Sequence, residues 1–247
     1  ACIVLQRRFA YTGHDIARNL QREHGIEEIC AFVTTRTSLK FLKNKKDVSY
    51  SGFLLDEDIQ RRYKDEKIDW EYLKRLEREY GIPNLWPYIN VDRVIRFGQL
   101  VREYPHDISR FSHEEMLRML QCYAKAIIAF LEKEKPDFLF SSPPGGMCTV
   151  LLHHIAKKKG VPALVMTFPC IRDRVLVSEK YDRFTFVESL IERYGELPVE
   201  KIPHFEKAKN FIREFRERPR AYSEIHERAR RKFTRRQHFG FLSPGRF

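Results

Sequence analysis

The sequence predicts an α/β protein with a mainly parallel sheet and helices on both faces. The strongest indication is a strand–loop–helix–strand unit between Lys135 and Phe168. Its two apolar runs, Phe138–Ser141 and Val161–Phe168, are typical of short strands buried on both sides. A similar half-unit begins the chain. Because a parallel pair of strands needs a crossover, repeated strand–helix units indicate a doubly wound sheet.

The first half-unit is predicted close to the start of the sequence. Thr12 and Asp15 have the spacing of a helix capping box, with Asp in place of the usual Glu, so a helix N-terminus and its partial positive charge are expected here. The expected elements are, in order, a strand at Cys2–Leu5, a turn at Tyr11–His14, a helix at Asp15–His24 and a strand at Ile29–Thr34.

The turn contains the candidate catalytic residues. A neutral imidazole is suited to taking a proton from a hydroxyl group near pH 7, which makes His14 a candidate general base. A polar residue in the first turn of a helix is also common without any catalytic role, and helix capping explains Asp15 at least as well as catalysis does. Gly13 lies beside the expected positive helix end and is a candidate contact for an anion.

Residues 35–110 are predicted to form an insertion of helices and loops rather than part of the sheet, because the strand–helix alternation fades there. Asp69–Tyr80 has apolar residues on one helical face and is followed by a glycine, a typical helix end. The next turn contains two prolines. Trp86, Asn90, Asp92 and Arg93 are candidates for a lip that holds an acceptor, although a Trp between prolines is more often a packing anchor.

A long helix is predicted from Ser112 to about Lys133. Ser112 and Glu115 have the spacing of a capping box, and the apolar residues that follow recur on one helical face. This helix leads the chain into the central strand–loop–helix–strand unit.

The loop of the central unit is the candidate ligand site. Doubly wound sheets bind ligands outside the carboxyl ends of their strands, at the start of the following helix. Ser142, Gly145 and Gly146 are therefore candidate substrate or anion contacts, although a tight turn explains the two glycines equally well. The loop has neither a GxGxxG nor a GxxxxGK[ST] pattern, so no tightly bound cofactor is expected. No metal is expected either, because His153 and His154 are consecutive rather than four residues apart.

Two arginines follow the second strand of the central unit. Arg172 and Arg174 flank Asp173, and their planar guanidinium groups are suited to holding a phosphate or a carboxylate. An exposed ion pair that contributes little to stability is the alternative interpretation.

Composition favours a globular protein. The chain has 247 residues, of which 43% are hydrophobic, enough for a substantial core. Its longest apolar run is far shorter than the roughly 20 residues that cross a bilayer, and no signal peptide is recognisable, so a cytoplasmic location is expected. The five cysteines are widely separated and contain no CxxC pair, which favours small buried apolar residues over a zinc site or a disulfide framework.

The net charge of +12 is concentrated near the end of the sequence. Residues 213–236 contain ten Lys or Arg and four Glu, a net charge of +6, and residues 197–247 are expected to form a linker and a basic helical tail. Aromatic residues between the arginines suit contact with acidic lipid or nucleic acid, whereas a solvated helix face is the simpler explanation. No known nucleic-acid-binding pattern accompanies the tail, so peripheral contact with the inner face of a membrane is the preferred partner interaction.

Several segments resemble the N-terminal Rossmann-like domain of capsular polysaccharide biosynthesis proteins, which are similar to GT-B glycosyltransferases. The resemblance covers roughly residues 1–196. The segments that carry it are EKEKPDFLFSS followed by PPGG and a helix, AKKKGVPALVM followed by the loop with Arg172 and Arg174 and then Ser178-Glu179, and the earlier stretch Glu77–Arg93.

The resemblance implies a two-domain enzyme whose N-terminal domain holds a glycan acceptor and whose C-terminal domain holds most of the nucleotide-sugar donor. An acceptor hydroxyl would displace the nucleotide, with His14 or Asp15 as base and with Gly145, Arg172 and Arg174 holding negative charge. Too few residues follow Arg236 for a second nucleotide-binding half, so the chain is expected to supply the acceptor side. The alternatives are a non-catalytic module that docks on acidic lipid or nucleic acid through its tail, and a sugar-nucleotide epimerase-like protein.

Overall fold

The computed structural model describes residues 1–6, 9–97, 111–169, 171 and 174–219. The chain divides into two compact units. Unit 1 comprises residues 1–167 and 176–186, and unit 2 comprises residues 168–175 and 187–247. The domain boundary predicted at residue 196 falls inside unit 2.

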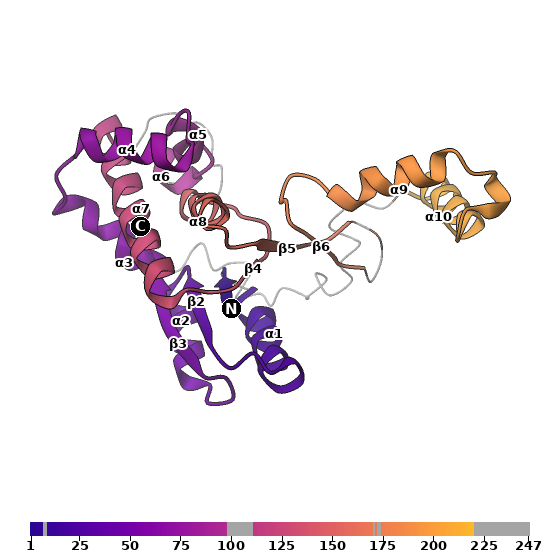
Figure 1. The fold of residues 1–247 in the computed structure, drawn as a ribbon, viewed down its shortest axis with the longest axis horizontal. Coiled ribbons are helices and arrows are strands. Elements are labelled where there is room, and N and C mark those ends of the chain that lie inside the picture. Colours follow the sequence, from indigo (N-terminus) through magenta and orange to yellow (C-terminus); the bar gives the residue numbers. More distant parts are fainter. Residues whose placement is uncertain (7–8, 98–110, 170, 172–173, 220–247) are drawn as a thin grey trace, which may run out of the picture. The chain divides into compact units, whose positions relative to one another are not determined.

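Unit 1 is built on a six-stranded sheet with the order β3-β2-β1-β4-β5-β6 (Figure 1). The first five strands are parallel, and β6 runs antiparallel to β5 at one edge. The predicted α/β fold with a mainly parallel, Rossmann-like sheet is therefore confirmed. The strands are β1 (Cys2–Leu5), β2 (Ile29–Val33), β3 (Tyr50–Leu55), β4 (Leu139–Ser141), β5 (Ala163–Thr167) and β6 (Leu176–Ser178).

The prediction that residues 35–110 contribute only helices and loops is wrong. β3 lies within this segment and pairs with β2, and the crossover helix α2 (Arg36–Asn44) precedes it. The residues of β1 and β2 are all buried, whereas most of β3 is only partly buried, as befits an edge strand. Its sequence YSGFLL includes Ser51 and Gly52, so it lacks the continuous apolar run by which strands buried on both faces are recognised.

Helices cover both faces of the sheet, as predicted. Alternate residues of a strand point to opposite faces, so Cys2 and Val4 join one core cluster while Ile3 and Leu5 join the other. The first cluster includes residues of α7 and α8, and the second includes residues of α1 and α2. These four helices are α1 (Phe9–His24), α2 (Arg36–Asn44), α7 (His113–Glu134) and α8 (Met147–Lys158). The shorter elements are α3 (Asp56–Arg61), η1 (Arg62–Lys64), α4 (Trp70–Tyr80), α5 (Trp86–Asn90) and α6 (Arg93–Phe97).

Helix α1 begins at Phe9, so the turn and the capping box predicted within residues 11–15 are wrong. Gly13 lies inside the helix, at a close approach to β1. A Cβ atom at position 13 would lie 2.3 Å from Cδ2 of Leu5 and 3.3 Å from Cε1 of Phe9. The glycine therefore allows α1 to pack closely against β1. The local sequence, which resembles a turn, does not reveal this role.

Replacing Gly13 by alanine should destabilise unit 1 by about 1–3 kcal/mol, because the added methyl group would overlap Leu5 in a packed core. Urea denaturation followed by circular dichroism measures this loss. Gly145→Ala is the matched control, since the nearest atom to its added Cβ lies 4.0 Å away. Equal stability of the two variants would show that the approach of α1 to β1 does not require glycine.

The helices predicted at Asp69–Tyr80 and from Ser112 to about Lys133 are confirmed. Asp69 caps α4 by accepting the Tyr72 N–H at 2.9 Å, and Gly81 ends that helix with a φ of 62°. Ser112 and Glu115 form the expected reciprocal capping box at the start of α7, with hydrogen bonds of 2.8 and 3.2 Å.

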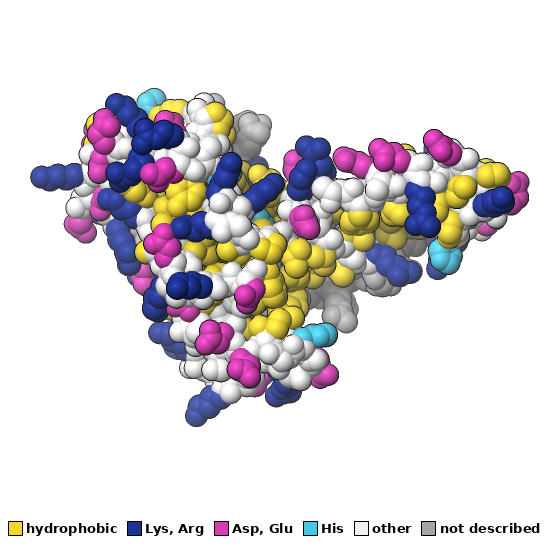
Figure 2. Space-filling view, viewed as in Figure 1, with side chains coloured by type: hydrophobic (Ala, Val, Ile, Leu, Met, Phe, Trp, Pro, Cys, Tyr) yellow, Lys and Arg dark blue, Asp and Glu magenta, His cyan; other side chains and the backbone are white. Residues whose placement is uncertain are grey.

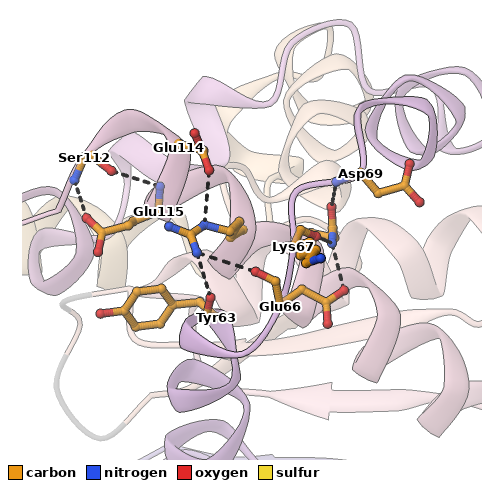
Figure 3. Close-up of polar contacts among 9 residues, drawn as sticks. Tyr63, Glu66, Lys67, Asp69, Ser112, Glu114 and Glu115 are labelled. Atoms are coloured by element: carbon orange, nitrogen blue, oxygen red, sulfur yellow. Dashed lines mark hydrogen bonds and ion pairs between the residues drawn. The ribbon is translucent and has the colours of Figure 1, made fainter.

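A fully buried glutamine attaches the segment before α4 to α7. Nε2 of Gln121 donates to Oε1 of Glu66 at 2.8 Å and to the carbonyl of Lys67 at 2.9 Å, and its Oε1 accepts the Asp69 N–H at 2.8 Å. Figure 3 labels Glu66, Lys67 and Asp69 and marks their hydrogen bonds with dashed lines. Because the side-chain amide uses both its donor and its acceptor, its burial is compensated.

The described part of unit 2 contains most of α9 (Thr185–Gly195), η2 (Val199–Lys201) and α10 (Phe205–Glu217). Apolar side chains of these helices are exposed between charged ones (Figure 2). They include Leu190, Ile191, Phe211, Ile212 and Phe215. The predicted basic tail after residue 219 lies outside the described residues. In the described ranges, no helix combines the length and the apolar character that a membrane crossing requires.

Candidate functional site

The candidate site lies where the strand order reverses, between β1 and β4. From β1 the chain proceeds to β2 and β3 on one side, and from β4 it proceeds to β5 on the other. Strand-to-helix loops diverge at such a point and accommodate ligands outside the carboxyl ends of the strands. Here the loops follow Leu5 and Ser141, and they meet where Nε2 of Gln6 lies 3.5 Å from the carbonyl oxygen of Pro143. Gly145 in the second loop is exposed.

The carboxylate of Asp92 occupies the N-terminus of α8. Its Oδ2 accepts the Met147 N–H at 3.0 Å, while its Oδ1 accepts the Val94 and Ile95 N–H groups at 3.0 and 3.1 Å. One side chain thus caps both α8 and α6, whose partial positive ends stabilise its charge. A Cβ atom at position 146 would lie 2.8 Å from Oδ2 of Asp92, so the absence of a side chain at Gly146 permits this approach.

The backbone of the loop is already hydrogen-bonded within the protein. The N–H groups of Gly145 and Gly146 point to Oγ1 of Thr149 at 3.2 and 3.3 Å, and that hydroxyl donates to the carbonyl of Gly146 at 3.0 Å. Ser142 is partly buried in the same loop. A phosphate at this helix end would have to compete with Asp92, whose carboxylate already accepts the Met147 N–H. The anion role predicted for Gly145 and Gly146 stays a prediction.

A second carboxylate, Asp56, lies at the carboxyl end of β3. The hydroxyl of Tyr123 donates to its Oδ1, and the thiol of Cys148 donates to its Oδ2 at 3.3 Å. Burial raises the pKa of Asp56 to about 6, and the charge of Asp92 adds to the rise, although the two hydrogen bonds oppose it. A carboxyl group whose pKa is raised in this way is suited to acid–base chemistry.

Sequence reasoning missed Asp56 and identified Asp92 only as part of the predicted lip, not as a helix cap. Asp56 and Asp92 lie in the segment that was expected to be an insertion, and their contacts come from α7 and α8, far along the chain. One available signal was the position of Asp56, immediately after the apolar end of a strand. Among the residues that the structure describes, no group of three or more His, Cys, Asp or Glu side chains is arranged to hold a metal ion.

The predicted catalytic residues lie elsewhere in unit 1. His14 is 2% exposed inside α1, with Nδ1 3.0 Å from the hydroxyl of Tyr50 and Nε2 3.1 Å from Oδ1 of Asp47. Tyr50 begins β3, so His14 is near the amino end of that strand rather than the loops at the carboxyl edge. Asp15 is exposed and forms an ion pair with Arg18 at 2.8 Å. The structure thus does not bring His14 and Asp15 to the candidate site, and their catalytic role stays a prediction.

The residues of the predicted lip differ in their surroundings. Trp86 is partly buried against the core, and its ring meets that of His113 edge to face at 5.1 Å. This contact is the packing role that the flanking prolines suggested. Asn90 and Arg93 are exposed on either side of Asp92 in the chain, which leaves both available to a ligand at the edge.

Of the predicted arginine pair, Arg174 is exposed in unit 2, and Arg172 lies outside the described residues. Their joint role in holding an anion stays a prediction.

Comparisons with protein-family models, curated proteins and solved structures found no match for this chain. Functional inference therefore depends on the residues at the carboxyl edge of the sheet and on the chemistry they permit.

Proposed function

We propose that this chain supplies the acceptor side of a nucleotide-sugar-dependent glycosyltransferase of surface, capsular-type polysaccharide biosynthesis. The observation that carries the proposal is the pair of carboxylates, Asp56 and Asp92, at the carboxyl edge of the sheet. Carboxylates accept hydrogen bonds from sugar hydroxyls, and the charge of Asp92 opposes a phosphate at α8. Such an edge suits an acceptor glycan better than the diphosphate of a donor. The assignment to polysaccharide biosynthesis comes from the sequence resemblance and not from the geometry of the site.

The proposed reaction has one displacement step. An acceptor hydroxyl attacks the anomeric carbon of the donor sugar, the bond from that carbon to the phosphate oxygen breaks, and the hydroxyl proton passes to a base. Asp56 is the residue of this edge best suited to be that base, because its pKa of about 6 lies close to neutral pH. The leaving diphosphate requires cationic groups that the two carboxylates do not supply.

The expected partners are a glycan acceptor and a nucleotide sugar, in the cytoplasm and at the inner face of a membrane. A second candidate function is docking on acidic lipid without catalysis. The observation that favours it is the exposed apolar stripe of α10, formed by Phe211, Ile212 and Phe215 just before the basic tail. Nucleic acid remains the less favoured partner.

Saturation-transfer NMR on the full chain tests the proposal. The probes are a panel of neutral methyl glycosides and, separately, uridine diphosphate. We expect at least one glycoside to receive saturation, and we expect that signal to fall by about half or more in Asp56→Asn but not in Asp137→Asn, a control at an exposed aspartate. Binding of uridine diphosphate without any glycoside, or a glycoside signal unaffected by Asp56→Asn, would contradict the acceptor role.

A further inference from the structure

A groove of about 940 Å³ runs along one face of α8. Val150, His153, His154 and Lys157 form its helical wall, at the spacing of a single helix face. Cys148, which contacts Asp56, precedes Val150 by two residues and so lies on a different face. The groove therefore lies away from Asp56. Its volume is within the range of about 300–1,000 Å³ that is typical of ligand pockets.

The other walls come from three segments of unit 1. They are the region around α5, the turn and first residue of β5 after α8, and the segment that follows β6. They contribute, among others, Asn84, Tyr88, Tyr181 and Arg183. Pro144 of the loop before α8 completes the lining.

Aromatic rings lie in pairs within the groove. Tyr88 meets His154 edge to face, with ring centroids 5.6 Å apart, and His153 meets Tyr181 in the same way at 6.0 Å. Because the two histidines are consecutive on α8, they place the two tyrosines on the same stretch of the groove. Tyr181 is 51% exposed, so much of its surface is available to a ligand.

Hydrogen bonds hold both imidazoles in position. Nε2 of His153 lies 2.8 Å from Oγ of the fully buried Ser141, and Nε2 of His154 donates to the carbonyl of Tyr80 at 2.7 Å. Burial lowers the pKa of His153 to about 4, so this ring is neutral at physiological pH. These hydrogen bonds thus fix the orientation of the two histidine rings that line the groove.

The charges around the groove nearly cancel. Lys157, Lys180 and Arg183 are its cations, and Glu179 and Asp182 are its anions. Such a mixture supplies donors and acceptors of hydrogen bonds without the concentrated positive field that selects a phosphate. The neighbouring N-terminus of α8 does not add such a field, because Asp92 caps it.

We propose that this groove binds a neutral oligosaccharide. A sugar ring has an apolar C–H face, which fits beside the tyrosine rings, and a rim of hydroxyl groups, which fits the mixed charges and the amide of Asn84. The inference extends the proposed function, on which its choice of a glycan ligand rests, to a second site on the opposite side of α8 from Asp56. There the groove holds a glycan segment remote from the reacting hydroxyl.

NMR of the full chain with ¹³C-labelled tyrosine tests the groove directly. The probes are maltotriose, cellotriose and chitotriose, and the Tyr88→Phe and Tyr181→Phe variants assign the two ring signals. We expect one trisaccharide to shift both signals, and we expect Tyr181→Ala to weaken its binding at least tenfold. Tyr11→Ala is the matched control, because Tyr11 is 56% exposed on α1, outside the groove, and its removal should leave the affinity unchanged.

Two results would overturn the groove proposal: no trisaccharide shifts the signals of Tyr88 and Tyr181, or Tyr181→Ala binds as tightly as the wild type. Failure here is distinct from failure of the acceptor role. If glycosides bind in an Asp56-dependent manner while the groove rings do not respond, the groove proposal fails and the proposed function stands. If the groove rings respond while Asp56→Asn has no effect on glycoside binding, the acceptor edge fails and the groove stands.

Discussion

Replacing Asp92 by alanine should lower the free energy of unfolding of unit 1 by about 2–4 kcal/mol. The change removes the acceptor for Val94, Ile95 and Met147 at once and leaves the first turns of α6 and α8 uncapped. Loss of a single N-cap costs about 0.5–2 kcal/mol, and amides left without an acceptor add to the loss. Urea denaturation at pH 7, with the slope compared between variants, measures the effect.

Two further variants separate capping from charge. Asp92→Asn keeps an oxygen that accepts hydrogen bonds and loses the negative charge, so its stability should lie between those of the wild type and Asp92→Ala. Asp137→Ala is the control for removal of an exposed aspartate and should change stability by less than about 0.5 kcal/mol. An Asp92→Ala variant as stable as this control would refute the double-cap interpretation.

Replacing Asp56 by asparagine should stabilise unit 1 at high pH and leave it nearly unchanged at low pH. The pKa of Asp56 rises from its ordinary value of 3.8 to about 6 in the fold. Its stabilising contribution is therefore complete below about pH 4 and is lost as the pH rises through about 6. At pH 8 the ionised carboxylate costs at most about 3 kcal/mol, since each pKa unit corresponds to about 1.4 kcal/mol. We expect Asp56→Asn to gain about 2–3 kcal/mol there.

Denaturation midpoints of the wild type and Asp56→Asn at pH 4, 6 and 8 test this dependence. Asparagine retains the size of the side chain, and its amide still pairs with the hydroxyl of Tyr123. Asp137→Asn is the control for replacement of an exposed carboxyl group. A difference between the wild type and Asp56→Asn that is the same at every pH would contradict the raised pKa.

The elements predicted correctly are those that a local sequence pattern specifies. The strands β1 and β2 and the central unit with α8 have apolar segments bounded by turns. Helix α4 has an apolar face and ends at Gly81, and α7 begins with the capping box of Ser112. β3 escaped recognition because a partly exposed edge strand tolerates Ser51 and Gly52. α1 was placed too late because Gly13 resembles a turn residue, whereas its function is close packing against Leu5.

The candidate site was harder to predict from the sequence because its residues come together only in the tertiary structure. The central loop was identified correctly as a feature at the carboxyl edge, but the groups that define its chemistry come from distant segments. Asp56 and Tyr123 are 67 residues apart, and Asp92 and Met147 are 55 apart. No local pattern joins such pairs. His14, by contrast, stood out as a titratable residue near a glycine, yet it packs against Tyr50 and Asp47.

The most decisive experiment is an amide chemical-shift titration of the ¹⁵N-labelled chain, first with the best-binding methyl glycoside and then with inorganic pyrophosphate. If the edge beside Asp92 takes a neutral hydroxyl ligand, the glycoside will shift the amide signals of Gly145, Gly146 and Met147, and pyrophosphate will leave them in place. Shifts with pyrophosphate and none with any glycoside would mean that α8 receives a phosphate despite its resident carboxylate, and the acceptor assignment would be wrong.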